Sequence, residues 1–331
     1  MEWKPYYRRE MELPETKGYL EELFGQSAND DALIDLIAED AILSFPHTSV
    51  HYAGAIQAQV VSALYRSGVE QVIALGVFHA WGLKPYATLY REAMNKNETT
   101  AVRLAAFSKL AGAFSPIKPS QETPFGEVAL SLPSTEKTSI MRPDEGVVNR
   151  EFSLDTFLSL IRFYAVLHKV APLHIMPIYI GMTRNPVTGS FDLASRVAAA
   201  IQPMASPSTA VVATGDLVHY GTAYSSKERM AGMPSTTKEL EVVFMKEVQR
   251  TLDLALINKN YVDAFQRADR VLNNDQRYLL PLIAELLKTD AGYKILSFQF
   301  SDYASILDVD RPCVVASSLV AYIPGEKSKE A

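Results

Sequence analysis

The sequence predicts a three-layer α/β/α fold around a mixed, mostly parallel sheet. Short apolar runs of strand length alternate with longer segments of helical period, and the runs at 41–46, 70–76 and 210–213 are apolar almost throughout. Such runs are typical of strands buried on both faces of a parallel sheet. With 331 residues and 48% hydrophobic content, the chain can bury a large core, and we expect a single domain over 1–331.

The amino-terminal part predicts one βαβ unit. Residues 16–39 have the period of a helix, and 41–46 is a strand-like run. Residues 54–68 repeat an apolar side chain at every fourth position, as an amphipathic helix does, and 70–76 is the next strand-like run. A crossover of this kind is right-handed.

The middle of the chain lacks such a pattern. Residues 115–150 contain five prolines among polar residues, and only 127–132 has the composition of a strand. We expect this segment to be a proline-rich loop insertion within the one domain, either functional or mobile.

The alternation returns from residue 153 onward. Ser153 is a candidate cap for a helix that runs to about residue 169. The later segments with strand character are 173–180, 210–215, 294–300 and 314–323, and those with helical character are 190–202, 237–257, 260–269 and 276–288.

Two histidines follow the first two predicted strands. His47 comes after Phe45-Pro46 and His79 after Val77-Phe78, and their separation of 79 − 47 = 32 residues corresponds to one βαβ repeat. The spacing predicts that they lie on neighbouring strand ends. Since ligands of open α/β sheets bind at the carboxyl ends of the strands, the two imidazoles are candidate metal ligands. The alternative is that each is an ordinary loop histidine.

A third strand-like run ends in a turn with two reactive side chains. Asp216 and His219 are three residues apart, close enough for the carboxylate to orient the imidazole. The alternative is an aspartate that caps a helix beside a surface histidine. Cys313, the single cysteine, has apolar neighbours and is predicted to be a core residue.

Composition and missing motifs exclude several function classes. The net charge is −6 without a long basic run, which argues against nucleic acid and anionic membranes as partners. No apolar run approaches the ~18 residues of a membrane span, and the amino terminus does not resemble a signal peptide, so we expect a cytoplasmic protein. The sequence has no dinucleotide or nucleotide phosphate loop, no nucleophile elbow and no H-E-x-x-H zinc motif.

Several blocks together resemble the Memo-like family, which is related in fold to the LigB-type subunit of class III extradiol ring-cleaving dioxygenases. The blocks are Pro46-His47-Thr48-Ser49-Val50-His51-Tyr52-Ala53-Gly54, Leu75-Gly76-Val77-Phe78-His79, Glu151-Phe152-Ser153-Leu154-Asp155 and Asp216-Leu217-Val218-His219-Tyr220-Gly221. They are similar to the family patterns P-H-A-G-Y-x-Y-x-G, L-G-P-S-H, E-H-S-x-E and S-D-F-x-H-W/Y-G. The resemblance covers most of the chain.

The resemblance implies roles for individual residues. His47 and His79 match the metal-site histidines, His219 matches the acid–base histidine of the ring-cleaving relatives, and Asp216 matches its acidic neighbour. The third metal position of the family lies in a C-G-x-x-P turn, where this chain has no cysteine. Asp275 is the candidate there, and it would complete the two-histidine, one-carboxylate triad of non-haem Fe(II) oxygenases.

Other positions depart from the family. Phe152 stands in place of the E-H-S-x-E histidine, Asp155 in place of its glutamate and Gly215 in place of the serine before Asp216. The early A-G-x-W-Y element of the family is also missing.

The resemblance implies an Fe(II) enzyme that cleaves a small catechol-like aromatic with O₂. The alternative is a Memo-like metal-binding or redox-associated protein without ring cleavage, and a metal-dependent hydrolase on the same scaffold is a third reading. The sequence leaves open the substrate, the metal and whether the protein is a homo-oligomer.

Overall fold

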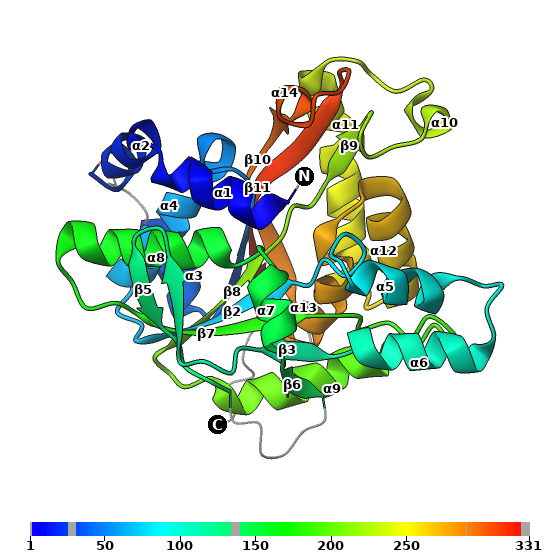
Figure 1. Ribbon diagram of the computed structural model, residues 1–331, viewed down its shortest axis with the longest axis horizontal. Helices are drawn as coiled ribbons and strands as arrows, with labels where there is room; N and C mark the ends of the chain where they lie inside the picture. Colours follow the sequence, from blue (N-terminus) through cyan, green and yellow to red (C-terminus); the bar gives the residue numbers. More distant parts are fainter. Residues whose placement is uncertain (1, 26–30, 134–139, 289, 326–331) are drawn as a thin grey trace.

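The central feature of the fold is a mixed sheet with helices on both faces, which confirms the predicted α/β/α sandwich (Figure 1). The computed structural model describes residues 2–25, 31–133, 140–288 and 290–325. In this part of the chain, nine strands form the large sheet in the order β10-β11-β1-β8-β2-β7-β3-β6, with β9 paired to β11.

The strands of the large sheet are β1 (Ile42–Phe45), β2 (Gln71–Val77), β3 (Ala113–Ser115), β6 (Met141–Pro143), β7 (His174–Ile180), β8 (Thr209–Thr214), β9 (His219–Gly221), β10 (Gly292–Asp302) and β11 (Cys313–Ile323). The helices are α1 (Trp3–Glu12), α2 (Pro14–Gly25), α3 (Asp31–Ala38), α4 (Val50–Arg66), α5 (Tyr86–Met94), α6 (Thr100–Leu110), α7 (Glu145–Arg150), α8 (Asp155–His168), α9 (Asp192–Ile201), α10 (Lys227–Met230), α11 (Thr237–Leu252), α12 (Tyr261–Arg267), α13 (Leu279–Leu287) and α14 (Ala304–Leu307). Short 3-10 and π-helical turns are η1 (Gln202–Met204), η2 (Asp253–Ile257), η3 (Ala268–Leu272) and η4 (Asp275–Tyr278).

The centre of the sheet is parallel and its flanks are antiparallel. Strands β1, β8, β2 and β7 run parallel to one another, while β11 pairs antiparallel with β1 and β3 pairs antiparallel with β7. Strand β8 lies between β1 and β2. The expectation that His47 and His79 follow neighbouring strands was therefore wrong, although both strands end at the same edge of the sheet.

Two apolar cores separate the sheet from its helices. One contains Leu64 of α4 and Phe157 of α8, and the other contains Val248 of α11 and Leu282 of α13. Because both faces are covered, every residue of β1 is buried. This explains why the strands have apolar runs instead of an alternating pattern.

The proline-rich segment 115–150 is not one continuous loop, contrary to the prediction. It begins in β3, forms the hairpin of β4 (Ser120–Thr123) and β5 (Gly126–Ala129), adds β6 to the edge of the sheet and ends in α7. Residues 134–139 lie outside the described part. The short strands were hard to recognise because prolines and polar residues at a sheet edge hide the alternation.

One local prediction was wrong and another was confirmed. Ser153 does not cap α8, since its hydroxyl donates to the carbonyl of Val77 (2.7 Å) and the helix begins after Leu154 without a side-chain cap. Cys313 is buried on β11, as predicted.

No helix of the described ranges combines the length and apolarity that a membrane crossing requires.

Gly221 offers a test of how β9 is held against the sheet. Its φ is +111°, and a Cβ at this position would collide with the carbonyl of Pro312 beside β11. We expect Gly221→Ala to lower the free energy of unfolding by about 3 kcal/mol, because it combines a disfavoured backbone angle with a clash against rigid backbone.

The matched control is Gly232→Ala, since Gly232 also has a positive φ (+75°) but open space around its Cα. This change should cost about 1 kcal/mol, from the backbone angle alone. Urea denaturation of both variants gives the comparison, and equal losses would contradict the clash.

Candidate metal centre

His47 and His79 meet at the carboxyl end of the parallel strands. His47 follows β1 and is 3% exposed, while His79 follows β2 and is 7% exposed. Their ring centroids are 5.0 Å apart, and the ring planes are nearly perpendicular. The loop that carries His47 is fixed by Gln57, whose buried side chain donates to the carbonyls of Pro46 (3.0 Å) and Thr48 (2.9 Å).

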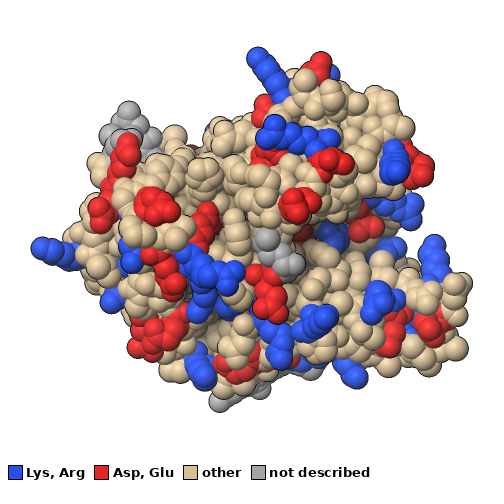
Figure 2. Space-filling view, turned by 45° about the horizontal axis from the view of Figure 1, so that its top comes forward, with Lys and Arg blue, Asp and Glu red and all other residues tan. Residues whose placement is uncertain are grey.

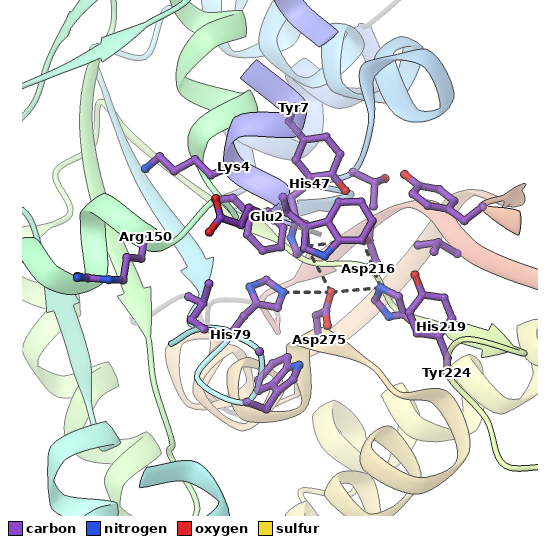
Figure 3. A pocket seen from close by; sticks show the side chains of 18 of the residues that line it. Glu2, Lys4, Tyr7, His47, His79, Arg150, Asp216, His219, Tyr224 and Asp275 are labelled. Carbon is purple, nitrogen blue, oxygen red and sulfur yellow. Dashed lines mark ion pairs between the residues drawn. The ribbon is translucent and has the colours of Figure 1, made fainter. Parts of the chain in front are cut away.

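Asp275 reaches the same point from the turn η4, far along the chain. Its Oδ2 lies 3.3 Å from Nε2 of His47 and 3.5 Å from Nε2 of His79. The backbone N–H of Asp275 donates to the carbonyl of Asp216 (3.0 Å), which joins this turn to the loop after β8. The structure thus brings the three expected metal-site residues together (Figure 3).

The three side chains suit a divalent cation. Their ligand atoms all lie within 4.8 Å of one another. Two donors at right angles on an ion with ~2.1 Å bonds are ~3.0 Å apart, and ~3.4 Å apart in a tetrahedron, so the observed separations are close to what one ion requires. Asp275 Oδ2 and His47 Nδ1 are buried without a hydrogen-bond partner. Two imidazoles and a carboxylate are the ligand set of non-haem Fe(II) sites.

Glu151 determines which nitrogen of His79 faces the centre. Its carboxylate accepts from the His79 ring at Nδ1 (2.9 Å) and from the His79 backbone N–H (2.7 Å). It also accepts from the backbone N–H groups of Phe152 (2.8 Å) and Ser153 (3.0 Å). A carboxylate that is held in this way orients a metal-binding histidine and leaves Nε2 for the metal. In the sequence, Glu151 was recognised only as part of a motif, and no role was predicted for it.

The charges around His79 shift the pKa values of both His79 and Glu151. Burial by itself lowers the pKa of His79, but Glu151 and Asp275 outweigh burial and raise the pKa to about 10. Burial by itself raises the pKa of Glu151, but the charge and hydrogen bonds of His79 hold that pKa below its usual value. The pair is therefore an ion pair around neutral pH when no metal is bound.

His219 stands across from His79 at the start of β9. Its Nδ1 is 3.0 Å from the carbonyl of Asn273, which can only accept, so Nδ1 carries the hydrogen. Its Nε2 lies 3.7 Å from Oδ2 of Asp275 and 3.8 Å from Oδ2 of Asp216. The expectation that Asp216 orients His219 by a hydrogen bond was wrong, because the Asn273 carbonyl does so.

Asp216 is fully buried, and both of its carboxylate oxygens lack a hydrogen-bond partner. Its Oδ2 is 3.6 Å from Nε2 of His47. Burial raises the pKa of Asp216 to about 7, although the charge of His47 acts in the opposite direction. Burial alone would also raise the pKa of Asp275, but His219 and the other two imidazoles hold it well below its usual range.

A cavity of about 1220 Å³ opens onto these five side chains. On the face of the molecule shown in Figure 2, lysine, arginine, aspartate and glutamate side chains are interspersed. Aromatic side chains from five parts of the chain line the cavity, namely Trp3, Tyr7, Trp81, Phe152, Tyr224 and Tyr303. Phe152 stacks on the ring of His79 with centroids 4.5 Å apart.

Helix α1 forms one wall of the cavity, and Asp155 holds it there. Arg8 donates to both oxygens of Asp155 (2.7 and 2.9 Å). Lys4 donates to the carbonyls of Val148 (3.0 Å) and Glu151 (2.9 Å). The sequence analysis missed this wall because the partners of α1 lie more than a hundred residues away in the chain.

The other described histidines lie elsewhere. His51 is exposed on α4, His168 ends α8 and His174 begins β7, and none of them lines the cavity. No protein-family model matches the chain, and no curated protein matches it.

The contacts of Glu151 lead to a prediction about metal affinity. Glu151→Gln keeps the size of the side chain but removes its charge, so it should lower the affinity for Zn²⁺ about 10–100-fold. Competition with a chromophoric chelator would measure this. Asp155→Asn is the matched control, because Asp155 is equally buried but contacts α1 instead of a ligand. Equal losses in the two variants would contradict a specific role for Glu151.

Proposed function

We propose that the protein is a non-haem Fe(II) dioxygenase of the class III extradiol type, which cleaves a catechol-like aromatic with O₂. The observation that carries the proposal is the group of His47, His79 and Asp275, a buried set of two histidines and one carboxylate that opens on a cavity. Fe(II) at this position would supply the ability to hold a catechol and O₂ side by side. The resemblance to the Memo-like and LigB-type proteins supports the same reading.

His219 is the acid–base in this proposal. Its Nδ1–H is engaged by the Asn273 carbonyl, so the lone pair of Nε2 faces the centre and can accept the proton of a substrate hydroxyl. Asp216 and Asp275 lie 3.8 and 3.7 Å from this nitrogen. The same nitrogen can return the proton to the product.

The walls of the cavity suit a planar aromatic substrate. Trp81 and Tyr224 contact the rings of His79 and His219, with centroids 5.1 and 5.0 Å apart, and Phe152 closes another side. Ligand pockets are commonly ~300–1,000 Å³, so this cavity has room for an aromatic ring beside O₂. Helix α1 limits the access of water from above the centre in the view of Figure 3.

A Memo-like metal-binding or redox-associated protein without ring cleavage is the second candidate. The observation that favours it is Phe152, which removes a histidine of the family motif and leaves an apolar wall beside His79. A cytoplasmic location belongs to both proposals.

Anaerobic reconstitution with Fe(II), followed by O₂ uptake with a panel of catechols, tests the proposal. We expect one tightly held Fe(II) per chain and O₂ consumption with at least one catechol. Bound Fe(II) without O₂ uptake would favour the second candidate, and the absence of Fe(II) binding would contradict both.

The two kinds of histidine should respond differently to substitution. His219→Gln should keep the Fe(II) and the substrate affinity but lower turnover about 10²–10⁴-fold, the usual contribution of an acid–base group. His47→Ala should lose the Fe(II) and all activity together, because it removes a ligand. Iron analysis and O₂ uptake on both variants give the comparison. Equal loss of Fe(II) in the two variants would overturn this division of roles.

A further inference from the structure

A second set of possible metal ligands lies beside the group formed by His47, His79 and Asp275. Asp216, His219 and Asp275 also have ligand atoms within 4.8 Å of one another, and they share Asp275 with the first set. Figure 3 shows Asp275 between His79 and His219, with ion-pair contacts to both.

The side chain that points to a ligand is Asp216. It is 0% exposed, and neither of its carboxylate oxygens has a hydrogen-bond partner, although the carboxylate lines the cavity. A buried carboxylate with no donor is costly unless a cation or a proton compensates it. Lys4 and Arg8, two cationic side chains that line the cavity, are engaged by the Glu151 and Asp155 segment.

The orientation of His219 adds a third donor. Because its Nδ1 hydrogen is directed at the carbonyl of Asn273, the Nε2 lone pair of the neutral ring faces Asp216 and Asp275. A lone pair that faces two carboxylates is repelled by them, and a divalent cation between the three groups would turn this repulsion into ligation.

We propose that Asp216, His219 and Asp275 form a second divalent-cation position, which shares the Asp275 carboxylate with the position at His47 and His79. Paired sites of this kind hold two ions ~3.5–4 Å apart. One imidazole and two carboxylates suit Mn²⁺, Fe²⁺ or Zn²⁺.

The two positions differ in strength for an electrostatic reason. One divalent cation neutralises the two carboxylates, whereas a second leaves the group with a net charge of +2 unless an anion follows from the cavity. The second ion therefore binds more weakly. This second metal position does not depend on ring cleavage. One consequence does rest on the proposed function: a second ion bound to Nε2 of His219 would stop that nitrogen from transferring protons.

Mn²⁺ alone, added to the tag-free chain, tests the position without any activity measurement. Equilibrium dialysis should show two Mn²⁺ per wild-type chain, one tight and one at least tenfold weaker. Electron paramagnetic resonance should show an isolated ion at one equivalent and a spin-coupled pair at saturation, because a shared carboxylate couples the two ions.

Asp216→Asn and His219→Gln should each bind a single Mn²⁺ with no spin-coupled signal. Asp155→Asn changes another buried aspartate outside the group and should still bind two. Circular dichroism checks that each variant is folded. If Asp216→Asn is not folded, the number of Mn²⁺ ions bound by His219→Gln tests the proposal. Saturation of the wild-type chain at one Mn²⁺, two uncoupled ions, or two ions in a folded Asp216 or His219 variant would overturn the proposal.

Discussion

The buried amide of Gln276 determines how the candidate centre is assembled. Its Nε2 donates to the hydroxyl of Ser44 on β1 (2.7 Å), and its Oε1 accepts from the hydroxyl of Tyr322 on β11 (2.8 Å). Gln276 is 0% exposed and directly follows Asp275. Since an unpaired buried amide would be costly, these bonds fix the turn against two strands and direct Asp275 at the histidines.

The surrounding structure holds several ionisable side chains close together in the centre. Three imidazoles and two carboxylates converge in a largely buried volume, where screening by water is weak. Glu151 and the Asn273 carbonyl hold two of the rings by Nδ1, so that their Nε2 atoms face the carboxylates. Such an arrangement is stabilised by protons or by cations that bind between the groups.

Two positions at which the sequence differs from the Memo-like pattern make specific contacts in the structure. Phe152, in place of a histidine, stacks on His79 and contributes an apolar wall. Asp155, in place of a glutamate, is held by two bonds from Arg8 and anchors α1 beside the cavity. Both positions therefore contribute to the site of this chain.

The sequence by itself determined the α/β/α layers and the histidines at the strand ends, because apolar runs and helical periods are local properties. It also suggested Asp275, although only through resemblance. The tertiary structure alone decided that β8 lies between β1 and β2, that Asn273 orients His219, and that α1 closes one side of the cavity. These features depend on contacts between residues far apart in the chain. Strand order, backbone acceptors and the packing partners of α1 leave no local signal in the sequence.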